Sequence, residues 1–237
     1  MSSAVSVMAE RILVLDGSPA GDAAAGMAAC VTPAPEGGYT VLTQTGAAGK
    51  QAAEGIGLLA ASALQQAGWG AGHAVQPDLV AVVTGPGSFT GLRASCAMAA
   101  GYALGAGCPL VGVTRGEALR PELDAQCASS GSVNGWLLVT AARRGRVFVE
   151  RAEGVQAVAL ADWSPLPGRW VLAGDAAASL PVEDAVFSAL IQPTAIQIAA
   201  VAVARLTGQL APRDALPLYV DPPEAKLPAA GLRSAPV

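Results

Sequence analysis

Apolar and polar positions along the first third of the chain form strand-like runs followed by a helix-like repeat. Residues 12–16 (ILVLD), 25–31 and 39–45 are short β-type runs with Gly, Pro and Ala turns between them, which predicts a three-stranded antiparallel meander. From residue 50 to 67, apolar residues recur at steps of three and four, which predicts one helix that ends at Gly68.

Buried strands and helices alternate over the following residues. Residues 78–85 (DLVAVVTG) form a nearly unbroken apolar run, as expected for a central parallel strand covered on both faces. A helix over about 90–104, a strand over 109–113 and a helix over 115–126 are predicted next. This order is typical of an α/β protein.

The second half of the chain repeats the change from strands to helices. Runs at 136–142 and 146–152 flank Arg143-Arg144-Gly145, which predicts a hairpin. A strand over 170–174, a short alanine-rich helix and a helix over about 193–207 follow.

The similar order of elements in the two halves predicts two lobes. We expect an N-terminal lobe of residues 1–110, which carries the glycine-rich segment described below, and a smaller C-terminal lobe of residues 111–237. A chain of 237 residues can bury one full core or two small ones without a disulfide or a metal.

Composition excludes several classes of protein. The chain has 14 Lys+Arg against 18 Asp+Glu, which argues against an independent nucleic-acid binder that neutralises phosphates. We expect no secretory signal, because the first ten residues lack a basic region followed by a long apolar run. We also expect no membrane span, because no run approaches about 18 apolar residues. With 14% charged residues and a mean hydropathy of +0.45, part of the surface is expected to be covered by another protein.

The cysteines and the single histidine do not suggest a metal site. Cys30, Cys96, Cys108 and Cys127 form no C-x-x-C pair, and His73 is the one histidine. We therefore expect no bound metal, and a reducing cytoplasm as the location. His73 is the one imidazole base available for Ser-His or Cys-His catalysis, but it lies in a glycine-rich loop where nothing in the sequence pairs with it.

One glycine-rich segment lies between a predicted buried strand and a predicted helix. Its nine residues are Gly85, Pro86, Gly87, Ser88, Phe89, Thr90, Gly91, Leu92 and Arg93. Amides at a helix N-terminus can receive an anion, so the segment is a candidate phosphate or nucleotide loop. It is equally a candidate strand-to-helix turn, with Ser88 or Thr90 as the cap. It matches neither a dinucleotide fingerprint nor a Walker A motif.

Three further features carry open alternatives. Asp16 ends the first strand, where it can contact a nucleotide or, in Asp-Gly, make a turn. The helices over 50–67 and 90–104 are rich in small residues, which suit either internal packing or a docking face. The arginine cluster at 143–146 either contacts phosphates or faces solvent.

Residues 78–114 closely resemble the signature of the TsaB (YeaZ) family of tRNA threonylcarbamoyladenosine biosynthesis proteins. The family hallmark, GPGSFTGLR before an alanine-rich helix, matches residues 85–93 without a gap. Residues 12–18, 141–150 and 217–226 resemble other family segments more loosely. Ala141, Arg146, Phe148 and Asp221 there replace the family's aspartate, glutamate, tyrosine and arginine.

The resemblance implies a fold and a set of partners. The fold is a two-lobed ASKHA-type (actin-like, ribonuclease-H-like) α/β fold with mixed five-stranded sheets flanked by helices. The implied role is a non-catalytic scaffold that binds and activates the catalytic subunit TsaD, which the ATPase TsaE joins. That complex makes N6-threonylcarbamoyladenosine at position 37 of tRNAs reading ANN codons. The chain itself is then expected to bind no cofactor, and ATP and tRNA act through the complex.

In such pairs the first two helices of the N-terminal lobe pack against TsaD. Eight residues are therefore expected to dock the partner: Ile56, Leu59, Ala60, Ala63, Ala94, Ala97, Met98 and Gly101. Two alternatives remain, namely a nucleotide-binding ASKHA-class enzyme using Asp16 and the glycine-rich segment, and a peptidase. A homodimer in the absence of TsaD also stays open.

Overall fold

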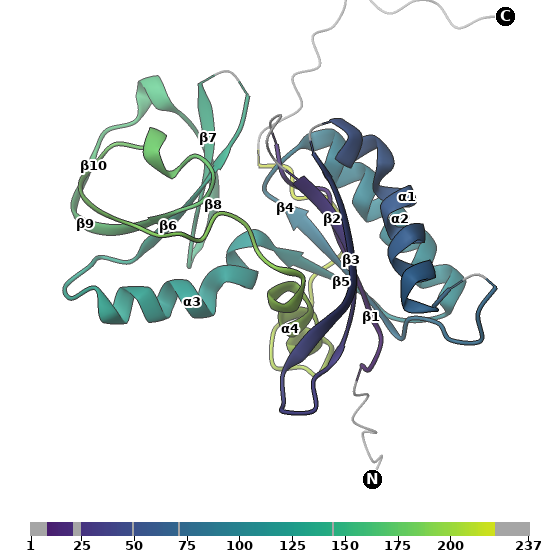
Figure 1. The fold of residues 1–237 in the computed structure, drawn as a ribbon. Helices are drawn as coiled ribbons and strands as arrows, with labels where there is room; N and C mark the ends of the chain where they lie inside the picture. Colours follow the sequence, from purple (N-terminus) through teal and green to yellow (C-terminus); the bar gives the residue numbers. More distant parts are fainter. Residues whose placement is uncertain (1–8, 21–24, 49, 71, 144, 221–237) are drawn as a thin grey trace, which may run out of the picture.

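The chain forms two mixed five-stranded sheets flanked by helices (Figure 1). The structure is a computed structural model, and it describes residues 9–20, 25–48, 50–70, 72–143 and 145–220. Residues 221–226 of the third loosely matching segment, which include Asp221, lie outside these residues. In the described part of the chain, no helix is both long enough and apolar enough to cross a membrane.

The first sheet has the strand order β3-β2-β1-β4-β5. Strands β1 (Ile12–Asp16), β2 (Ala25–Pro33) and β3 (Tyr39–Ala48) form an antiparallel meander, which confirms the prediction. Strands β4 (Leu79–Gly85) and β5 (Leu110–Thr114) extend it in parallel. Every residue of β1 and β4 is buried, as predicted for β4 from its unbroken apolar run.

The second sheet repeats this arrangement with the order β8-β7-β6-β9-β10. Strands β6 (Trp136–Ala141), β7 (Arg146–Arg151) and β8 (Gly154–Ala159) are antiparallel, and the predicted β6–β7 hairpin is confirmed. Strands β9 (Leu166–Ala173) and β10 (Val182–Phe187) are parallel to β6. The sequence pattern did not reveal β8 or β10, which are the two edge strands.

Helices cover both faces of the first sheet. Helices α1 (Lys50–Ala67) and α2 (Phe89–Ala106) lie side by side on one face, and α4 (Ala195–Leu206) covers the other (Figure 1). Alternate residues of β1 divide between the two faces, because successive side chains of a strand point to opposite sides. Leu13 and Leu15 pack beneath α1 and α2, whereas Ile12 and Val14 pack against α4.

The second sheet has one helix and two short 3-10 turns. Helix α3 (Arg115–Ser129) packs its buried leucines on one face. The other face is covered from the turns η1 (Leu160–Asp162) and η2 (Ala177–Ser179). The predicted alanine-rich helix is therefore wrong in length, since η2 is a single 3-10 turn. In the order of elements, η1 corresponds to α1 and η2 to α2, because each occupies the equivalent connection between strands of its own sheet.

The helix that follows each sheet packs on the other sheet. Helix α3 follows β5 but covers the second sheet, and α4 follows β10 but covers the first. The chain therefore passes between the sheets twice, first between Thr114 and Arg115 and again before α4. The boundary between residues 110 and 111 stays a prediction, and β5 of the first sheet continues to Thr114.

Replacement of Ile198 by alanine tests how strongly α4 holds the first sheet. Ile198 is fully buried in the core between α4 and that sheet, so Ile198→Ala is expected to lower the free energy of unfolding by about 2–5 kcal/mol. Ile196 lies on the same helix but is 38% exposed, so Ile196→Ala is expected to cost under about 1 kcal/mol. Urea denaturation measures both values, and equal losses would contradict the packing of α4.

Candidate functional site

The glycine-rich segment, residues 85–93, packs directly on the turn that follows β1. Gly87 and Gly91 face the main chain of that turn. A Cβ atom on Gly87 would clash with the carbonyl oxygen of Ser18, and one on Gly91 with the carbonyl oxygen of Gly17. Glycine is therefore needed at both positions so that two stretches of main chain can touch.

Ser88 is the N-cap of α2. Its Oγ accepts a hydrogen bond from the Gly91 N–H at 3.3 Å, and its own N–H donates to the carbonyl oxygen of Ser18 at 2.8 Å. Thr90, the other predicted cap, is an exposed residue of the first turn. Two amides that a phosphate would use are thus bonded within the chain, which favours the strand-to-helix turn over a phosphate loop.

The larger side chains of the segment divide between core and surface. Pro86 and Leu92 are buried. Phe89 is 42% exposed, and its ring centroid lies 5.4 Å from that of Tyr219. The guanidinium carbon of Arg93 lies 5.3 Å from the Phe89 ring centroid, within the range of a cation–π contact. The start of α2 therefore presents an aromatic and cationic surface.

Asp16, the predicted nucleotide contact, is enclosed by the protein. It is 1% exposed, and its Oδ1 accepts a hydrogen bond from the Ser18 N–H at 2.8 Å. Burial raises the pKa of Asp16, although the guanidinium of Arg115 opposes this shift. In this structure a nucleotide in solution cannot reach the carboxyl group.

The eight residues predicted to dock a partner differ in exposure. Three are buried in the chain's own core beneath α1: Ile56, Ala60 and Ala63. Three are half-buried: Leu59, Ala94 and Met98. Two on α2 are exposed: Ala97 and Gly101. The apolar stripe of α1 therefore serves the first sheet, and its three buried residues offer no surface to a partner.

Two leucines that the sequence pattern did not single out are the most exposed large apolar side chains in the described part of the chain. Leu58 on α1 is 79% exposed, and Leu104 on α2 is 85% exposed. Leu58 lies two positions after the buried Ile56, so a helical wheel places it about 200° away from that residue. We call the exposed residues Leu58, Ala61, Ala97, Gly101 and Leu104 the outer helix face.

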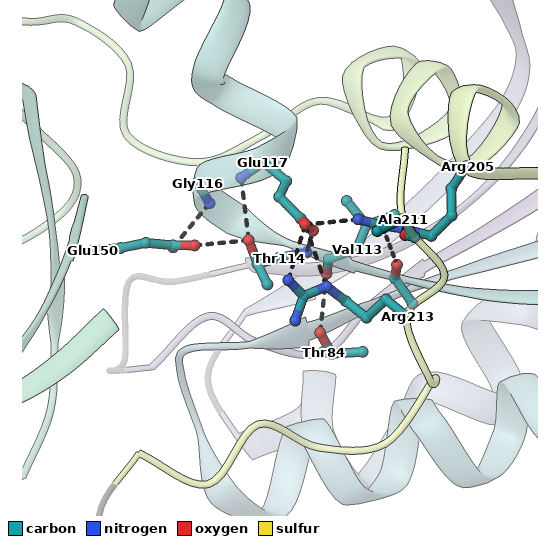
Figure 2. A network of polar contacts seen from close by, with 10 residues as sticks. Thr84, Val113, Thr114, Gly116, Glu117, Glu150, Arg205, Ala211 and Arg213 are labelled. Carbon is teal, nitrogen blue, oxygen red and sulfur yellow. Dashed lines mark hydrogen bonds and ion pairs between the residues drawn. The ribbon is translucent and has the colours of Figure 1, made fainter. Parts of the chain in front are cut away.

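Polar contacts hold residues 114–117, where β5 passes into α3, and we call this segment the junction (Figure 2). Glu117 accepts hydrogen bonds from the Thr114 N–H at 2.9 Å, from Arg205 Nη2 at 2.6 Å and from Arg213 Nη2 at 2.9 Å. Burial alone would raise the pKa of Glu117. The hydrogen bonds from Thr114 and Arg205, with the charge of Arg213, lower it instead. The ionised carboxylate therefore ties α3 to α4 and to the segment after α4.

Glu150 reaches the junction from the second sheet (Figure 2). Thr114 Oγ1 donates to Glu150 Oε1 at 2.7 Å, and the Gly116 N–H donates to Glu150 Oε2 at 2.9 Å. Burial raises the pKa of Glu150 to about 7 against these hydrogen bonds and the charge of Arg115. Sequence analysis missed Glu150, and the available signal was an acidic residue next to the buried Val149 of a strand.

The remaining catalytic candidates do not come together in the described residues. No group of three or more His, Cys, Asp or Glu side chains could hold a metal ion there. His73 is exposed in the loop between α1 and β4. Burial raises the pKa values of Cys30 and Cys96 to about 11, so both stay protonated at neutral pH and are poor nucleophiles.

Relatives of the chain and of its fold are known. Curated proteins of Mycobacterium bovis and Mycobacterium tuberculosis, described as uncharacterized, are 33% identical over 156 residues. That match covers 63% of this chain and 66%, just under two thirds, of each relative. YeaZ from Pseudomonas aeruginosa has a TM-score of 0.59 at 19% identity, with 89% of this chain and 99% of that chain covered.

A second Pseudomonas aeruginosa structure, described as an uncharacterized protein with similarity to peptidase YEAZ, has a TM-score of 0.60 at 20% identity. The match covers 90% of this chain and 100% of that chain. Together with the two mixed sheets, these likenesses confirm the two-lobed ASKHA-type α/β fold. A family model described as TsaD: tRNA N6-adenosine threonylcarbamoyltransferase matches residues 44–165, more than half of the chain. The chain therefore belongs to the TsaD tRNA N6-adenosine threonylcarbamoyltransferase family, and it has the fold of the YeaZ proteins.

Proposed function

We propose that the chain serves in making N6-threonylcarbamoyladenosine at position 37 of tRNAs that read ANN codons. Its role is that of a non-catalytic subunit that binds a catalytic TsaD subunit through the outer helix face and stabilises its active conformation. The observation that carries this proposal is the exposure of Leu58 and Leu104 on neighbouring helices of a chain that belongs to the TsaD family.

The outer helix face has the composition of an interface core. Helix α2 has one charged residue, Arg93, among its 18 residues, and Ala97 and Gly101 lie exposed between Arg93 and Leu104. Small residues allow a partner helix to come close, and the large leucines supply apolar area. Arginine and aromatic residues such as Phe89 are enriched at protein–protein interfaces relative to the rest of the surface. About 800 Å² per partner would make an interface of standard size.

The second sheet of this chain leaves the outer helix face open. Helices α1 and α2 lie on the side of the first sheet that is remote from strands β6 to β10 (Figure 1). The two most exposed leucines are therefore not covered by the chain's own second lobe. A separate polypeptide is the simplest way to remove this apolar surface from water.

The buried state of the candidate catalytic groups supports a role without chemistry of its own. Asp16 is enclosed, two of the cysteines are protonated, and the amides of Ser88 and Gly91 are bonded within the chain. ATP, the ATPase TsaE and tRNA are therefore proposed to act through the complex, which we place in the cytoplasm. The nucleotide-binding enzyme has less support because Asp16 is enclosed. The peptidase has less support because Cys30 and Cys96 are buried and protonated, although His73 is exposed.

Arginine substitutions on the outer helix face test the docking proposal. Leu104→Arg and Gly101→Arg each place a charge where an apolar interface is proposed, so retention of the TsaD subunit in co-purification should fall at least about tenfold. A Cβ at Gly101 meets no atom within 4 Å, and Leu104 is 85% exposed, so the fold should persist in circular dichroism. Phe187→Arg, on a 62% exposed residue of β10, is the matched control and should retain TsaD.

Retention of TsaD by both α2 variants at the wild-type level would contradict the docking proposal. Gel filtration of the chain alone then shows whether the same variants change its oligomeric state. If the variants abolish a homodimer but leave TsaD binding intact, the outer helix face belongs to a second copy of the chain and the proposed interface is wrong.

Titration calorimetry with magnesium and ATP tests whether the isolated chain holds a nucleotide. We expect no binding at submillimolar concentration, because Asp16 is 1% exposed and Ser88 caps α2. Submillimolar binding that Asp16→Ala weakens would instead favour the nucleotide-binding enzyme. Thr90→Ala, on an exposed hydroxyl near the same turn, serves as the control for a nonspecific surface effect.

A further inference from the structure

Glu150 connects the two sheets at the point where the chain first crosses between them. Thr114 is the last residue of β5 and pairs with Gly85 in the first sheet. Glu150 belongs to β7 of the second sheet, where it pairs with Leu138. The 2.7 Å hydrogen bond from Thr114 Oγ1 to Glu150 Oε1 therefore joins one sheet to the other.

Gly116 makes room for the carboxyl group of Glu150. A Cβ at this position would clash with the Cδ of Glu150, and it would come within 2.6 Å of Oε1. In a helix interior, glycine lowers stability by about 1 kcal/mol relative to alanine. Glycine is therefore not the residue expected from helix propensity at Gly116. Its presence here, together with the 2.9 Å hydrogen bond from its N–H to Oε2, shows that the first turn of α3 is shaped around this side chain.

A cavity gives solvent a route to the buried carboxyl. The cavity has a volume of about 310 Å³, and Glu150 and Trp136 are among its lining residues. Glu150 itself is 5% exposed, so protons can exchange while most of the side chain stays dehydrated. The charged groups that face Glu150 or line the same cavity come from α3, from the β7–β8 hairpin and from the segment after α4: Arg115, Glu117, Arg120, Arg151, Glu153 and Arg213.

The hydrogen-bonding groups around Glu150 accommodate both charge states. The ionised carboxylate accepts from Thr114 and from the Gly116 N–H, as the distances show. When the carboxyl carries a proton on a lone pair that faces the cavity, it still accepts from Thr114 and from Gly116, because each carboxyl oxygen has two lone pairs. The neutral acid keeps its partners while removing a negative charge from a dehydrated site, so the neutral form fits the junction better.

We propose that Glu150 is a pH-dependent tie between the two lobes, which holds the β5–α3 junction firmly while its carboxyl is protonated and loosens it on ionisation. The direction follows from linkage. Burial raises the pKa of Glu150 from 4.5 to about 7, so the closed junction binds the proton more tightly than an opened, solvated one. The stabilisation is fully present below about pH 4.5 and is lost as the pH rises through about 7.

Nuclear magnetic resonance of the full chain tests the tie directly at Gly116. The amide ¹⁵N shift of Gly116 should titrate with a midpoint near pH 7 in the wild type, since its N–H donates to the carboxyl. Glu150→Gln, a neutral side chain of the same shape, should remove that titration. Glu153→Gln is the matched control, because Glu153 is exposed in the same cavity and should leave the titration unchanged.

Hydrogen exchange measures whether ionisation loosens the junction. Protection factors of the first-turn amides of α3, corrected for the intrinsic pH dependence of exchange, should fall about tenfold between pH 6 and pH 8 in the wild type. They should stay constant in Glu150→Gln. This test involves no partner subunit, so its result is independent of TsaD binding.

Three results would each overturn the proposal. One is a Gly116 shift that does not titrate between pH 6 and 8. Another is a titration that persists in Glu150→Gln, which would assign it to Asp16 or another neighbour. The third is a Gly116 titration without any loss of protection. Should Glu150→Gln fail to fold, the wild-type titration and protection values still decide the matter.

Discussion

The arrangement of the two sheets depends on two acidic side chains, Glu117 and Glu150, that hold the first crossing of the chain. Glu117 is tied to α4 and the following segment by two arginines, and Glu150 reaches the junction from β7. Both side chains accept hydrogen bonds from backbone amides at the start of α3, where the first amides of a helix have no partner within the helix. Because α3 then covers the second sheet while α4 returns to the first, this turn connects both sheets and α4.

The glycine-rich segment contributes to the same architecture through main-chain contact. Gly87 and Gly91 allow the start of α2 to lie against the turn after β1, and Ser88 bonds to both sides of that contact. The register of α2 on the sheet is thereby set at its first residues. This register places Leu92 in the core, and it leaves Ala97, Gly101 and Leu104 exposed. The motif thus positions a surface and leaves little room for a phosphate.

Sequence patterns predicted the first sheet better than the second for a physical reason. Strand β4 is covered on both faces, so its apolar run is unmistakable. The missed strands β8 and β10 are edge strands with half-exposed faces, and β10 contains Glu183 and Asp184 side by side. The first half of β9 was also missed. It pairs with β10 but not with β6, and it contains Pro167 and Gly168, which are unusual in a strand.

The sequence by itself determined the meander, the four helices α1 to α4, a cap at either Ser88 or Thr90, and the family signature, since each depends on the spacing of nearby residues. The tertiary structure alone decided which residues are accessible. It buried Ile56, Ala60, Ala63 and Asp16, exposed Leu58 and Leu104, and brought Glu150 to Gly116 across 34 positions of the chain. Burial and contact between distant segments depend on how whole elements pack, and no local pattern records that packing.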